Sequence, residues 1–579
     1  MKRRNFLANI AVTGALINTT TEGPAAKSGP FLREDKSKET LKADLVIAGG
    51  GLGGCAAALA ALRNGLTVIL TEETDWIGGQ ISQQGVPPDE HQWIETHGAP
   101  KAYRDFRNAI REYYIKNYPL TDEAKSRKHL NPGDGAVSRI CCEPKVAVAI
   151  LSDLFAPYLS TGKLTLLTEH KAVSAKVQGN RVTSLEVKSS RSGKHLTLTA
   201  PYFVDATELG DLLPMTGTEF VTGTESKAET NELHAPEKGN PDNVQAFTMC
   251  FAIDYQPGEN HVIEKPAEYD FWKNHVPKMN KSWSGRLLDL SYSNPKTLEP
   301  KTLGFHPEGI KTGDALNLWL YRRIISRQNF VPETYAGDIT IVNWPQNDYM
   351  LGNLIGASEK DFKKHVDRAK QLSLSLLYWL QTEAPRPDGG KGWPGIRLRR
   401  DIMGTEDGLA KYPYVRESRR IKAVFTIKEE HVGAANREVA AERGATGAIA
   451  NGAPGPKDKA AEFHDSVGVG YYHIDLHPSS SGDNYIDFAS LPFQIPLGAL
   501  IPIRIENLLP ANKNIGTTHI TNGCYRLHPV EWSIGEAVGL LVKFATGEKV
   551  SPRVVRENAE LLKGFQGFLV GEGVELGWK

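Results

Sequence analysis

Hydrophobic residues near the start of the chain come in short continuous runs that are separated by glycines and a helical segment. Residues 45–48 form the first run, and an alanine-rich stretch over 51–63 follows it and ends at an Asn-Gly pair. A second run over 66–71 stops at Glu72. Continuous apolar runs are typical of parallel strands that are buried on both faces. The pattern therefore predicts the strand, helix and strand of a Rossmann-like unit.

The rest of the chain shows more varied patterns. Short alternating segments from 164 to 204 predict a small antiparallel meander beside the parallel sheet. A strand over 243–254 leads into residues 255–350, which lack periodicity and are rich in Pro, Asn, Trp and Tyr, as in loops that form lids and pockets. Leucines in 359–383 predict a mostly buried helix. We therefore predict an α/β fold in which a Rossmann-like domain carries an inserted α+β substrate or cap domain.

Glycines follow the first predicted strand in the spacing Gly-x-Gly-x-x-Gly. Gly49 permits a tight turn, Gly51 lets a pyrophosphate approach the backbone, and Gly54 lets the helix pack against the strand. Glu72 can accept hydrogen bonds from both hydroxyls of an adenosine ribose. A glycine motif alone would also suit a plain strand-to-helix turn. Because strand, motif, helix, strand and acid occur in the right order, we predict a dinucleotide site.

A second glycine pair, Gly78-Gly79, lies in the segment ETDWIGGQISQQG directly after the acid. Here the sequence resembles the FAD-dependent oxidoreductases related to the fumarate reductase flavoproteins, in which such a pair lies along the FAD phosphates and ribityl chain. The resemblance continues at 201–211 (PYFVDATELGD) and 505–539, and 414–420 (YVRESRR) is similar to one subfamily. It implies these FAD-binding residues: Gly49, Gly51, Gly53, Gly54, Glu72, Gly78, Gly79, Gln80, Val173, Asp205, Ala206, Thr207, Gly210, Asp211, Asn512 and Gly535.

Two positions depart from the family pattern. Glu208 stands where the family usually has a glycine after Asp-Ala-Thr, and Asn512 stands where a glycine is common. A glutamate beside the phosphates would repel them. We therefore expect that Glu208 points away from the nucleotide or that the local path of the chain differs.

A helix is predicted to begin near Pro529 and to continue through VEWSIGEAVGLLVKFA. The resemblance implies that its N-terminus points at the flavin pyrimidine edge, where helix amides would stabilise the negative charge of reduced flavin. The alternative is a helix that only packs on the sheet.

Composition limits the classes of partner. The 579 residues are 40% hydrophobic and 23% charged, which suits large cores, and the 68 basic and 68 acidic residues cancel, so nothing indicates nucleic acid. No apolar stretch reaches about 18 residues, so no membrane span is expected. The predicted domains are a signal peptide and linker over 1–40, the first part of the FAD-binding domain over 41–225, the inserted domain over 226–490, the C-terminal part of the FAD-binding domain over 491–560 and a tail over 561–579.

The N-terminal segment KRRNFLA resembles a twin-arginine export signal, with two arginines before a Phe-Leu pair and a weakly apolar stretch. This route carries folded proteins, so a cofactor can be inserted before export. We expect a periplasmic or secreted protein, and a cytoplasmic protein with a chance arginine pair is the alternative.

Cysteine usage points to an electron partner outside the chain. The five cysteines contain no Cys-x-x-Cys pair and none follows the second glycine pair, so the redox disulfide of flavin disulfide reductases is not expected. Cys141 and Cys142 could form a vicinal disulfide or remain buried thiols, and we favour the thiols. An external electron acceptor or donor is therefore expected.

Two clusters are candidates for catalysis. Arg526 and His528 rank first, because the resemblance places their segment against the flavin ring. Strand alternation would put His473, Asp475 and His477 on one face, as a carboxylate flanked by two imidazoles. Any one of these histidines could instead be structural.

Two further interpretations remain open at the level of sequence. Two nitrogen ligands and one oxygen on a single strand are a weak metal signal, so no metal site is expected. The charged residues of YVRESRR could take part in proton transfer or form a solvated ion-pair face.

We therefore predict an exported FAD-dependent oxidoreductase that transfers a hydride between a polar small molecule, such as a sugar or polyol, and flavin N5. One alternative is a protein that holds FAD for a structural purpose and binds a partner. Another is an NAD-dependent dehydrogenase. The oligomeric state and the direction of the reaction stay open.

Overall fold

A computed structural model describes residues 39–578 apart from 311–312, 438–451 and 454–458. The predicted signal sequence lies outside the described residues, and strand β1 begins at Glu39, inside the segment predicted as signal and linker. Residues from Glu39 onward form one compact unit, so the predicted boundaries at 225, 490 and 560 stay predictions.

A five-stranded parallel sheet positions the first glycine motif. Its strands follow the order β25 (Leu508–Pro510), β8 (Tyr202–Asp205), β2 (Leu45–Ala48), β3 (Val68–Glu72) and β4 (Leu164–Thr168). All neighbouring pairs are parallel. Every residue of β2 is buried, as expected for a central strand covered on both faces. The predicted Rossmann-like unit is confirmed.

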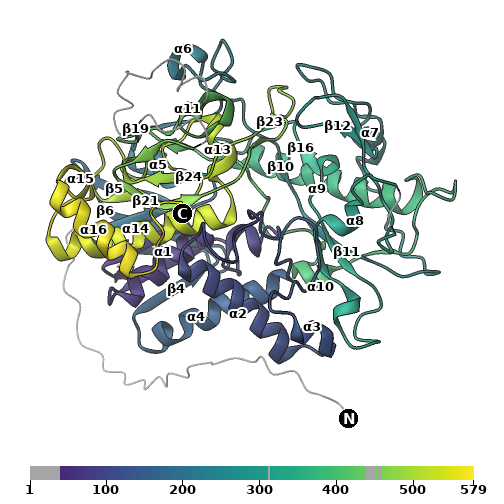
Figure 1. The fold of residues 1–579 in the computed structure, drawn as a ribbon, viewed down its shortest axis with the longest axis horizontal. Helices are drawn as coiled ribbons and strands as arrows, with labels where there is room; N and C mark the ends of the chain where they lie inside the picture. The colour runs from purple at the N-terminus through teal and green to yellow at the C-terminus, as the bar shows by residue number, and fades with distance from the viewer. Residues whose placement is uncertain (1–38, 311–312, 438–451, 454–458, 579) are drawn as a thin grey trace, which may run out of the picture. The chain divides into compact units, whose positions relative to one another are not determined.

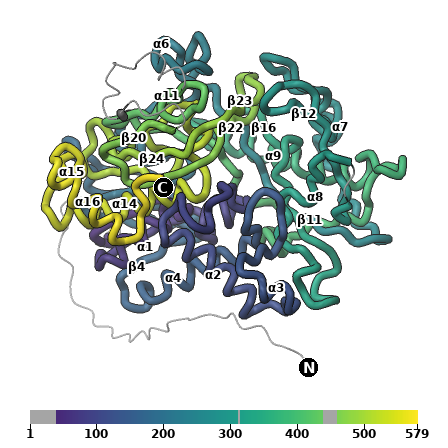
Figure 2. Tube along the Cα trace, viewed as in Figure 1, coloured from purple at the N-terminus to yellow at the C-terminus, as the bar shows by residue number. Residues whose placement is uncertain are grey.

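Helix α1 (Leu52–Arg63) packs directly against α14 (His528–Glu548). A Cβ atom on Gly535 would lie 2.0 Å from the carbonyl oxygen of Gly53, so glycine lets the two backbones touch. Figures 1 and 2 show these N-terminal and C-terminal helices side by side. Gly535 is therefore a packing residue of the helix pair, and its part in FAD binding stays a prediction.

A second sheet lies next to the parallel one. Its order is β1 (Glu39–Lys42), β7 (His195–Thr199), β6 (Arg181–Ser189) and β5 (His170–Gln178), with β1 parallel to β7 and the other pairs antiparallel. The predicted meander is confirmed only in part, because the two ends of the predicted stretch, β4 and β8, belong to the parallel sheet.

The middle of the chain builds its own sheet and helices, which Figure 1 shows in teal and green beside the nucleotide-binding part. The sheet has the order β14 (Arg323–Ile325), β15 (Ile339–Val342), β11 (Phe251–Tyr255) and β17 (Ile396–Leu398), and all its pairs are antiparallel. The predicted buried helix is confirmed as α9 (Glu359–Thr382). Around them lie β10 (Phe247–Thr248), β16 (Asp348–Tyr349), β12 (Ser291–Ser293), β13 (Pro300–Thr302), α7 (Tyr269–Asn274), α8 (Leu318–Tyr321) and α10 (Arg400–Met403).

The chain returns to the nucleotide-binding part before the predicted end of the inserted domain, because β18 (Arg420–Ile421) pairs with β9 (Phe220–Val221). Short antiparallel pairs follow: β19 (Gly452–Ala453) with β20 (Glu462–Phe463), β21 (Ser466–Gly470) with β24 (Phe493–Pro496), and β22 (Ile474–Leu476) with β23 (Ile486–Phe488). The other helices are α2 (Lys101–Asn117), α3 (Asp122–Ser126), α4 (Pro144–Ser160), α5 (Leu212–Thr216), α6 (Lys227–Thr230), α11 (Glu429–Val432), α13 (His519–Tyr525), α15 (Pro552–Glu557) and α16 (Ala559–Gly571). Among the described residues, no helix has the length and apolarity that crossing a membrane requires.

Candidate functional site

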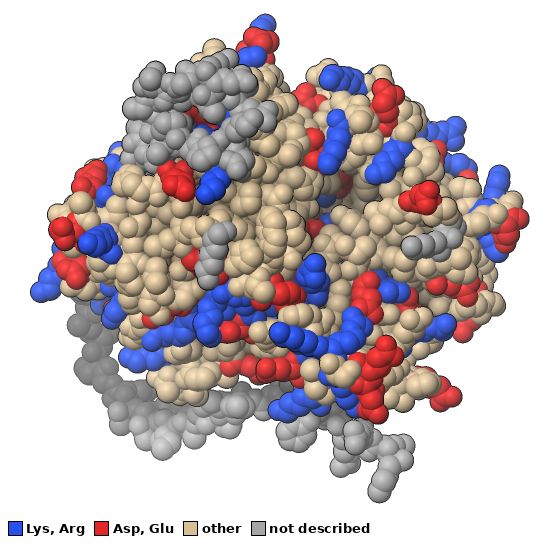
Figure 3. All heavy atoms as spheres, in the orientation of Figure 1, with Lys and Arg blue, Asp and Glu red and all other residues tan. Residues whose placement is uncertain are grey.

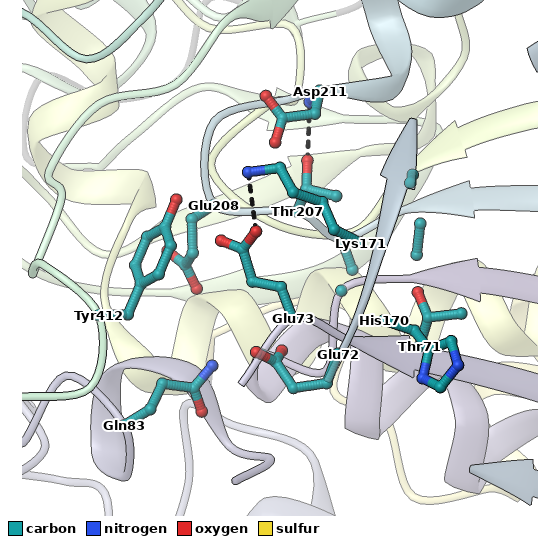
Figure 4. A pocket seen from close by; sticks show the side chains of 15 residues that line it. Thr71, Glu72, Glu73, Gln83, His170, Lys171, Thr207, Glu208, Asp211 and Tyr412 are labelled. Carbon is teal, nitrogen blue, oxygen red and sulfur yellow. Dashed lines mark hydrogen bonds and ion pairs between the residues drawn. The ribbon is translucent and has the colours of Figure 1, made fainter. Parts of the chain in front are cut away.

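A cleft opens at the carboxyl ends of β2, β3 and β8, where ligands of parallel sheets bind. We call it the nucleotide cleft (Figure 4). Its lining residues are Ala48, Gly49, Gly51, Thr71, Glu72, Glu73, Gln83, His170, Lys171, Ala172, Ala206, Thr207, Glu208, Asp211 and Tyr412. Of the predicted FAD-binding residues, the wall thus contains Gly49, Gly51, Glu72, Ala206, Thr207 and Asp211.

Glu72 is held in place by the glycine turn itself. Its carboxylate accepts hydrogen bonds from the backbone N–H groups of Gly50 at 2.9 Å and Thr74 at 2.8 Å. Burial raises the pKa of Glu72 to about 7. Gly49 has a φ of +100°, and a Cβ there would lie 2.2 Å from the Ala206 carbonyl oxygen, so the turn requires glycine. The acid expected to bind ribose therefore lies beside the predicted phosphate turn.

Other predicted glycines act through backbone packing. A Cβ on Gly53 would lie 1.8 Å from the Ala511 carbonyl oxygen, and one on Gly54 would lie 2.0 Å from that of Gly49. Gly78 and Gly79 both have positive φ angles, and Gly79 approaches the backbone of the first glycine turn. These residues shape the cleft without lining it.

Three predicted FAD-binding residues have other places. Val173 is 40% exposed and lies where the pairing of β5 with β6 is irregular, so its neighbour Ala172 lines the cleft instead. Asp205 accepts hydrogen bonds from the N–H groups of Thr207 and Leu212 and fixes the turn after β8. Gly210 has a φ of +66° and packs on Arg419. None of these three residues lines the cleft.

Of the two alternatives expected for Glu208, the one in which it points away is wrong, because Glu208 lines the nucleotide cleft. One carboxylate oxygen is buried without a partner and lies 3.3 Å from the position of a Cβ on Gly51. The other lies 2.6 Å from the ammonium of Lys513, which is itself buried. Asn512, the second departure, donates its amide to the Ala206 carbonyl oxygen at 3.2 Å. A buried counter-ion thus permits an acid at this place.

A second carboxylate lies at the amino end of α1. Glu531 accepts a hydrogen bond from the N–H of Gly53 at 3.0 Å and another from the side-chain amide of Gln80. Burial raises the pKa of Glu531 to about 6, although the ammonium of Lys513 opposes the rise. The site thus contains helix amides, a lysine and an acid, Glu531, whose pKa is close to neutral pH.

These residues fit the nucleotide part of FAD. The glycine turn leaves room for a diphosphate at the start of a helix, Glu72 can accept from a ribose, and Lys513 supplies positive charge. Buried oxygen atoms of Gln80 and Glu208 without hydrogen-bond partners mark polar space at the same place.

A second, larger cavity lies between the nucleotide-binding part and the middle of the chain. We call it the polar cavity, and its empty volume is about 820 Å³, including the part that is open to solvent. It is lined by Asp89, Tyr292, Pro295, Leu303, Leu316, Leu318, Tyr321, Arg322, Asn343, Trp344, Pro345, Tyr414, Arg416, Tyr472, His473, Asp475, His477, Tyr485, Asp487 and Arg526. Both predicted catalytic clusters thus meet in one cavity, except for His528.

Charged side chains in the polar cavity are paired. Arg526 lies 2.9 Å from a carboxylate oxygen of Asp475 and donates to the hydroxyl of Tyr414 at 2.9 Å. His477 lies between two acids, with Nδ1 at 2.6 Å from Asp348 and Nε2 at 3.6 Å from Asp475. The strand alternation that predicted a common face for these groups is correct.

The two acids that flank His477, Asp475 and Asp348, have lowered pKa values. Burial opposes the charge on Asp475, but His477 and Arg526 hold its pKa well below the ordinary value. Asp348 is also buried, and Arg416, 3.0 Å away, and His477 hold its pKa below the ordinary value. Two carboxylates therefore fix the orientation of His477.

Comparison with known proteins decides the family. The family described as FAD dependent oxidoreductase matches residues 44–569. The chain belongs to this FAD dependent oxidoreductase family. The match decides for FAD over a nicotinamide cofactor. No curated protein sequence gives a significant match.

Several solved flavoprotein structures are similar to the chain at low identity. E. coli quinol fumarate reductase FrdA is 12% identical over 92% of this chain and 74% of its own, with a TM-score of 0.29. p-Nitrophenol 4-monooxygenase PnpA from Pseudomonas putida is 10% identical over 92% of this chain and 88% of its own, with a TM-score of 0.34. L-proline dehydrogenase from P. horikoshii is 17% identical over 33% of this chain, with a TM-score of 0.17. The match spans only 25% of the length of that dehydrogenase. Such scores carry no argument on substrate.

In this FAD dependent oxidoreductase His528 has a structural place. Its Nδ1 accepts from the backbone N–H of Asp89 at 3.2 Å, and its Nε2 donates to the carbonyl oxygen of Val86 at 3.1 Å. Burial lowers the pKa of His528 to about 4. Because both ring nitrogens are engaged by backbone, this geometry favours a structural role for His528, and its proton transfer stays a prediction. His528 holds the segment that carries Asp89.

Sequence reasoning missed several residues of the polar cavity. Asp89, Arg322, Asn343 and Trp344 line it, and Asp348 supports it, yet none stands in a motif that local pattern would mark. The signal for Arg416 was YVRESRR, but the solvated-face interpretation of that segment is wrong, because its charged residues are buried.

A series of contacts links the cleft to the cavity, and it starts where Glu531 lies beside Gly51 of the cleft wall. The amide of Gln80 donates to Glu531 and, at 3.0 Å, to the carbonyl oxygen of Arg526. Arg526 in turn lines the polar cavity. A cofactor running along Gln80 from the cleft would therefore bring its far end to this cavity. Among the described residues, no cluster of three His, Cys, Asp or Glu side chains could hold a metal ion, and all five cysteines are free and buried.

Proposed function

We propose that the polar cavity binds a polar small molecule and that a hydride passes between this molecule and N5 of FAD. One observation carries the proposal: Arg526 and the strand with Asp475 and His477 meet in one cavity. Contacts of Gln80 with Arg526 and with Glu531, which lies beside Gly51, link this cavity to the nucleotide cleft. The predicted sugar or polyol class is consistent with this wall of charged and aromatic side chains.

His477 is the proton-transfer group of this proposal. Because Asp348 accepts from Nδ1, the neutral ring keeps a lone pair on Nε2, which can take a proton from a substrate hydroxyl. Asp475 stabilises the imidazolium that forms. Bound FAD supplies the hydride acceptor or donor, and the reverse direction uses the same proton.

Unpaired donors orient the substrate. The Nε atoms of Arg322, Arg416 and Arg526, the amide of Asn343 and the indole N–H of Trp344 are buried and lack hydrogen-bond partners. Buried donors without partners are costly, so a ligand that offers several oxygen atoms to them gains affinity. This donor set favours a ligand with many hydroxyl or carboxylate oxygens.

Anaerobic bleaching of the yellow holoenzyme tests the function. A panel of sugars, polyols and hydroxy acids is added without oxygen, and flavin absorbance is followed. The expected result is bleaching by one class and loss of that bleaching in His477→Gln with FAD still bound. Stoichiometric FAD with no bleaching by any member, and no reoxidation of reduced enzyme by their oxidised forms, would favour the flavin-holding binding protein.

Export and the electron partner complete the proposal. The signal-like segment at the N-terminus supports transport of the folded holoenzyme to the periplasm or beyond. Because all five thiols are buried and free, electrons leave for an external acceptor rather than for a disulfide of this chain.

A further inference from the structure

A third cavity lies beside the polar cavity and has a different character. We call it the aromatic cavity, and its empty volume is about 1020 Å³, including the part that is open to solvent. It is lined by Trp93, His97, Lys459, Ala460, Ala461, Glu462, Pro492, Gln494, Gly577 and Trp578. Nothing in the proposed hydride transfer uses it.

Its rings form a packed cluster with one open face. Trp93 stacks on His97 with ring centres 6.1 Å apart and meets Trp578 at 5.8 Å and Tyr471 at 5.4 Å. Trp93 is 37% exposed, although a large apolar ring gains by burial. In Figure 3 the surface around the place where Figure 1 marks the C-terminus is mostly uncharged. The cavity therefore suits a neutral ligand with a flat face.

Two segments separate the aromatic cavity from the polar cavity and contribute to both. Tyr471 belongs to the ring cluster, and the next residue, Tyr472, lines the polar cavity. Asp89 lines the polar cavity, while His91, two residues on, packs against Trp578 with ring centres 5.3 Å apart. The two cavities are thus neighbours that share the segments around residues 89–91 and 471–472.

A further aromatic contact leads toward the predicted flavin segment. The indole N–H of Trp578 donates to the carbonyl oxygen of Phe493 at 3.0 Å, and Phe493 stacks on Tyr525 with ring centres 4.1 Å apart. Tyr525 directly precedes Arg526 of the polar cavity. One hydrogen bond to the backbone and one stacked ring pair therefore lead from Trp578 to the residue before Arg526.

We propose that the aromatic cavity binds a quinone that reoxidises the enzyme. The inference rests on the proposed function only in requiring an external acceptor. A quinone has a flat neutral ring for Trp93 and two carbonyl oxygens for donors such as His97 and Lys459. A sugar would also stack on Trp93, but it would have no use for the contacts that lead from Trp578 toward Tyr525.

The transfer balances without another reactant. The two-electron-reduced enzyme loses two electrons and two protons and returns to the oxidised form. The quinone gains two electrons and two protons and becomes the hydroquinone. Electrons cross the segments that the two cavities share, and solvent exchanges protons with both cavities.

Stopped-flow reoxidation tests this site without any substrate. Holoenzyme is reduced photochemically without oxygen and mixed with 2,3-dimethoxy-5-methyl-1,4-benzoquinone, and the return of flavin absorbance is followed. We expect a rate that saturates with quinone concentration. Trp93→Ala should need about tenfold more quinone for half-saturation, which is the upper range for one lost aromatic pair, and Trp93→Phe should restore most of the affinity.

Phe271→Ala is the matched control. Phe271 is 46% exposed and stacks on His275, as Trp93 stacks on His97, but it lies on α7. It should reoxidise like the wild type. A rate that never saturates, or an unchanged half-saturation in folded Trp93→Ala, would overturn the proposal, as would binding of a neutral oligosaccharide at Trp93 that leaves reoxidation unaffected. Because reduction is photochemical, failure to find a substrate for the polar cavity would leave this result intact.

Discussion

The ammonium of Lys513 lies 2.6 Å from the carboxylate of Glu208, and both groups are buried beside the glycine turn that precedes α1. The pair explains how a chain can carry an acid where a diphosphate is expected. Without Lys513, the turn would face two carboxylates, Glu208 and Glu531, and the negative charge of FAD would meet them uncompensated. Removal of one partner should therefore cost more than removal of both.

Lys513→Met should lower the free energy of unfolding by about 3–5 kcal/mol, because it leaves Glu208 buried and unpaired. FAD affinity, measured by flavin fluorescence, should fall as well. The double variant Lys513→Met/Glu208→Gln should recover more than half of the lost stability in urea unfolding. Arg504→Met, whose partner Glu219 is half-exposed, is the control and should cost no more than about 1 kcal/mol. Equal losses in the single and double variants would contradict the charge argument.

FAD affinity should depend on pH through Glu531. In the free protein this acid is protonated below about 6 and ionised above it. A diphosphate at the amino end of α1 favours the protonated form, so affinity is full below about 6 and falls, by up to about tenfold per pH unit, as the pH rises above that value. Fluorescence titrations between pH 5 and 8 measure this slope.

Glu531→Gln should flatten that pH dependence, because the amide keeps an acceptor for the Gly53 N–H but carries no charge. Glu557→Gln, an exposed acid on α15, should leave the dependence unchanged. If Glu531→Gln weakened FAD equally at every pH, the carboxylate would be a direct ligand of FAD instead.

Flavin reduction should distinguish Arg526 and His477 from His528. Arg526→Met keeps bulk but removes the charge that pairs with Asp475, so FAD should bind and reduction should slow by roughly 10²–10³-fold. His477→Gln should remove the fall in rate on the acidic side of the pH profile of the reductive half-reaction, because that fall reports a catalytic base.

His528→Gln should behave differently, because its ring is engaged by backbone on both sides. It should lower the free energy of unfolding without changing the shape of that pH profile. A lost limb in His528→Gln, with an unaltered profile in His477→Gln, would reverse the assignment.

Export should depend on the arginine pair itself. Replacing Arg3 and Arg4 by Lys keeps the charge, but the pair is recognised by a receptor, so the precursor should remain inside the cell. Fractionation and immunoblotting measure the outcome, and Lys2→Arg serves as the control. Normal secretion of the Lys-Lys variant would point to a different route.

Local pattern was sufficient for the elements that determine their own environment. The strand, glycine turn and helix over 45–63 follow from contiguous residues, because a buried strand, a tight turn and a packed helix each impose a composition on their own segment. The same holds for α9 and for the face shared by His473, Asp475 and His477, which strand alternation sets by itself.

Roles that depend on distant partners could be decided only by the tertiary structure. His528 and His477 look alike in sequence, but one ring binds two backbone groups of residues 86 and 89 while the other lies between Asp348 and Asp475. From the sequence alone, Glu208 is expected to repel the phosphates. In the structure its counter-ion is Lys513, a residue 305 positions away. A hydrogen bond or ion pair has a range of a few ångströms, so the long-range packing of the chain, and not the order of its residues, determines which polar groups become partners.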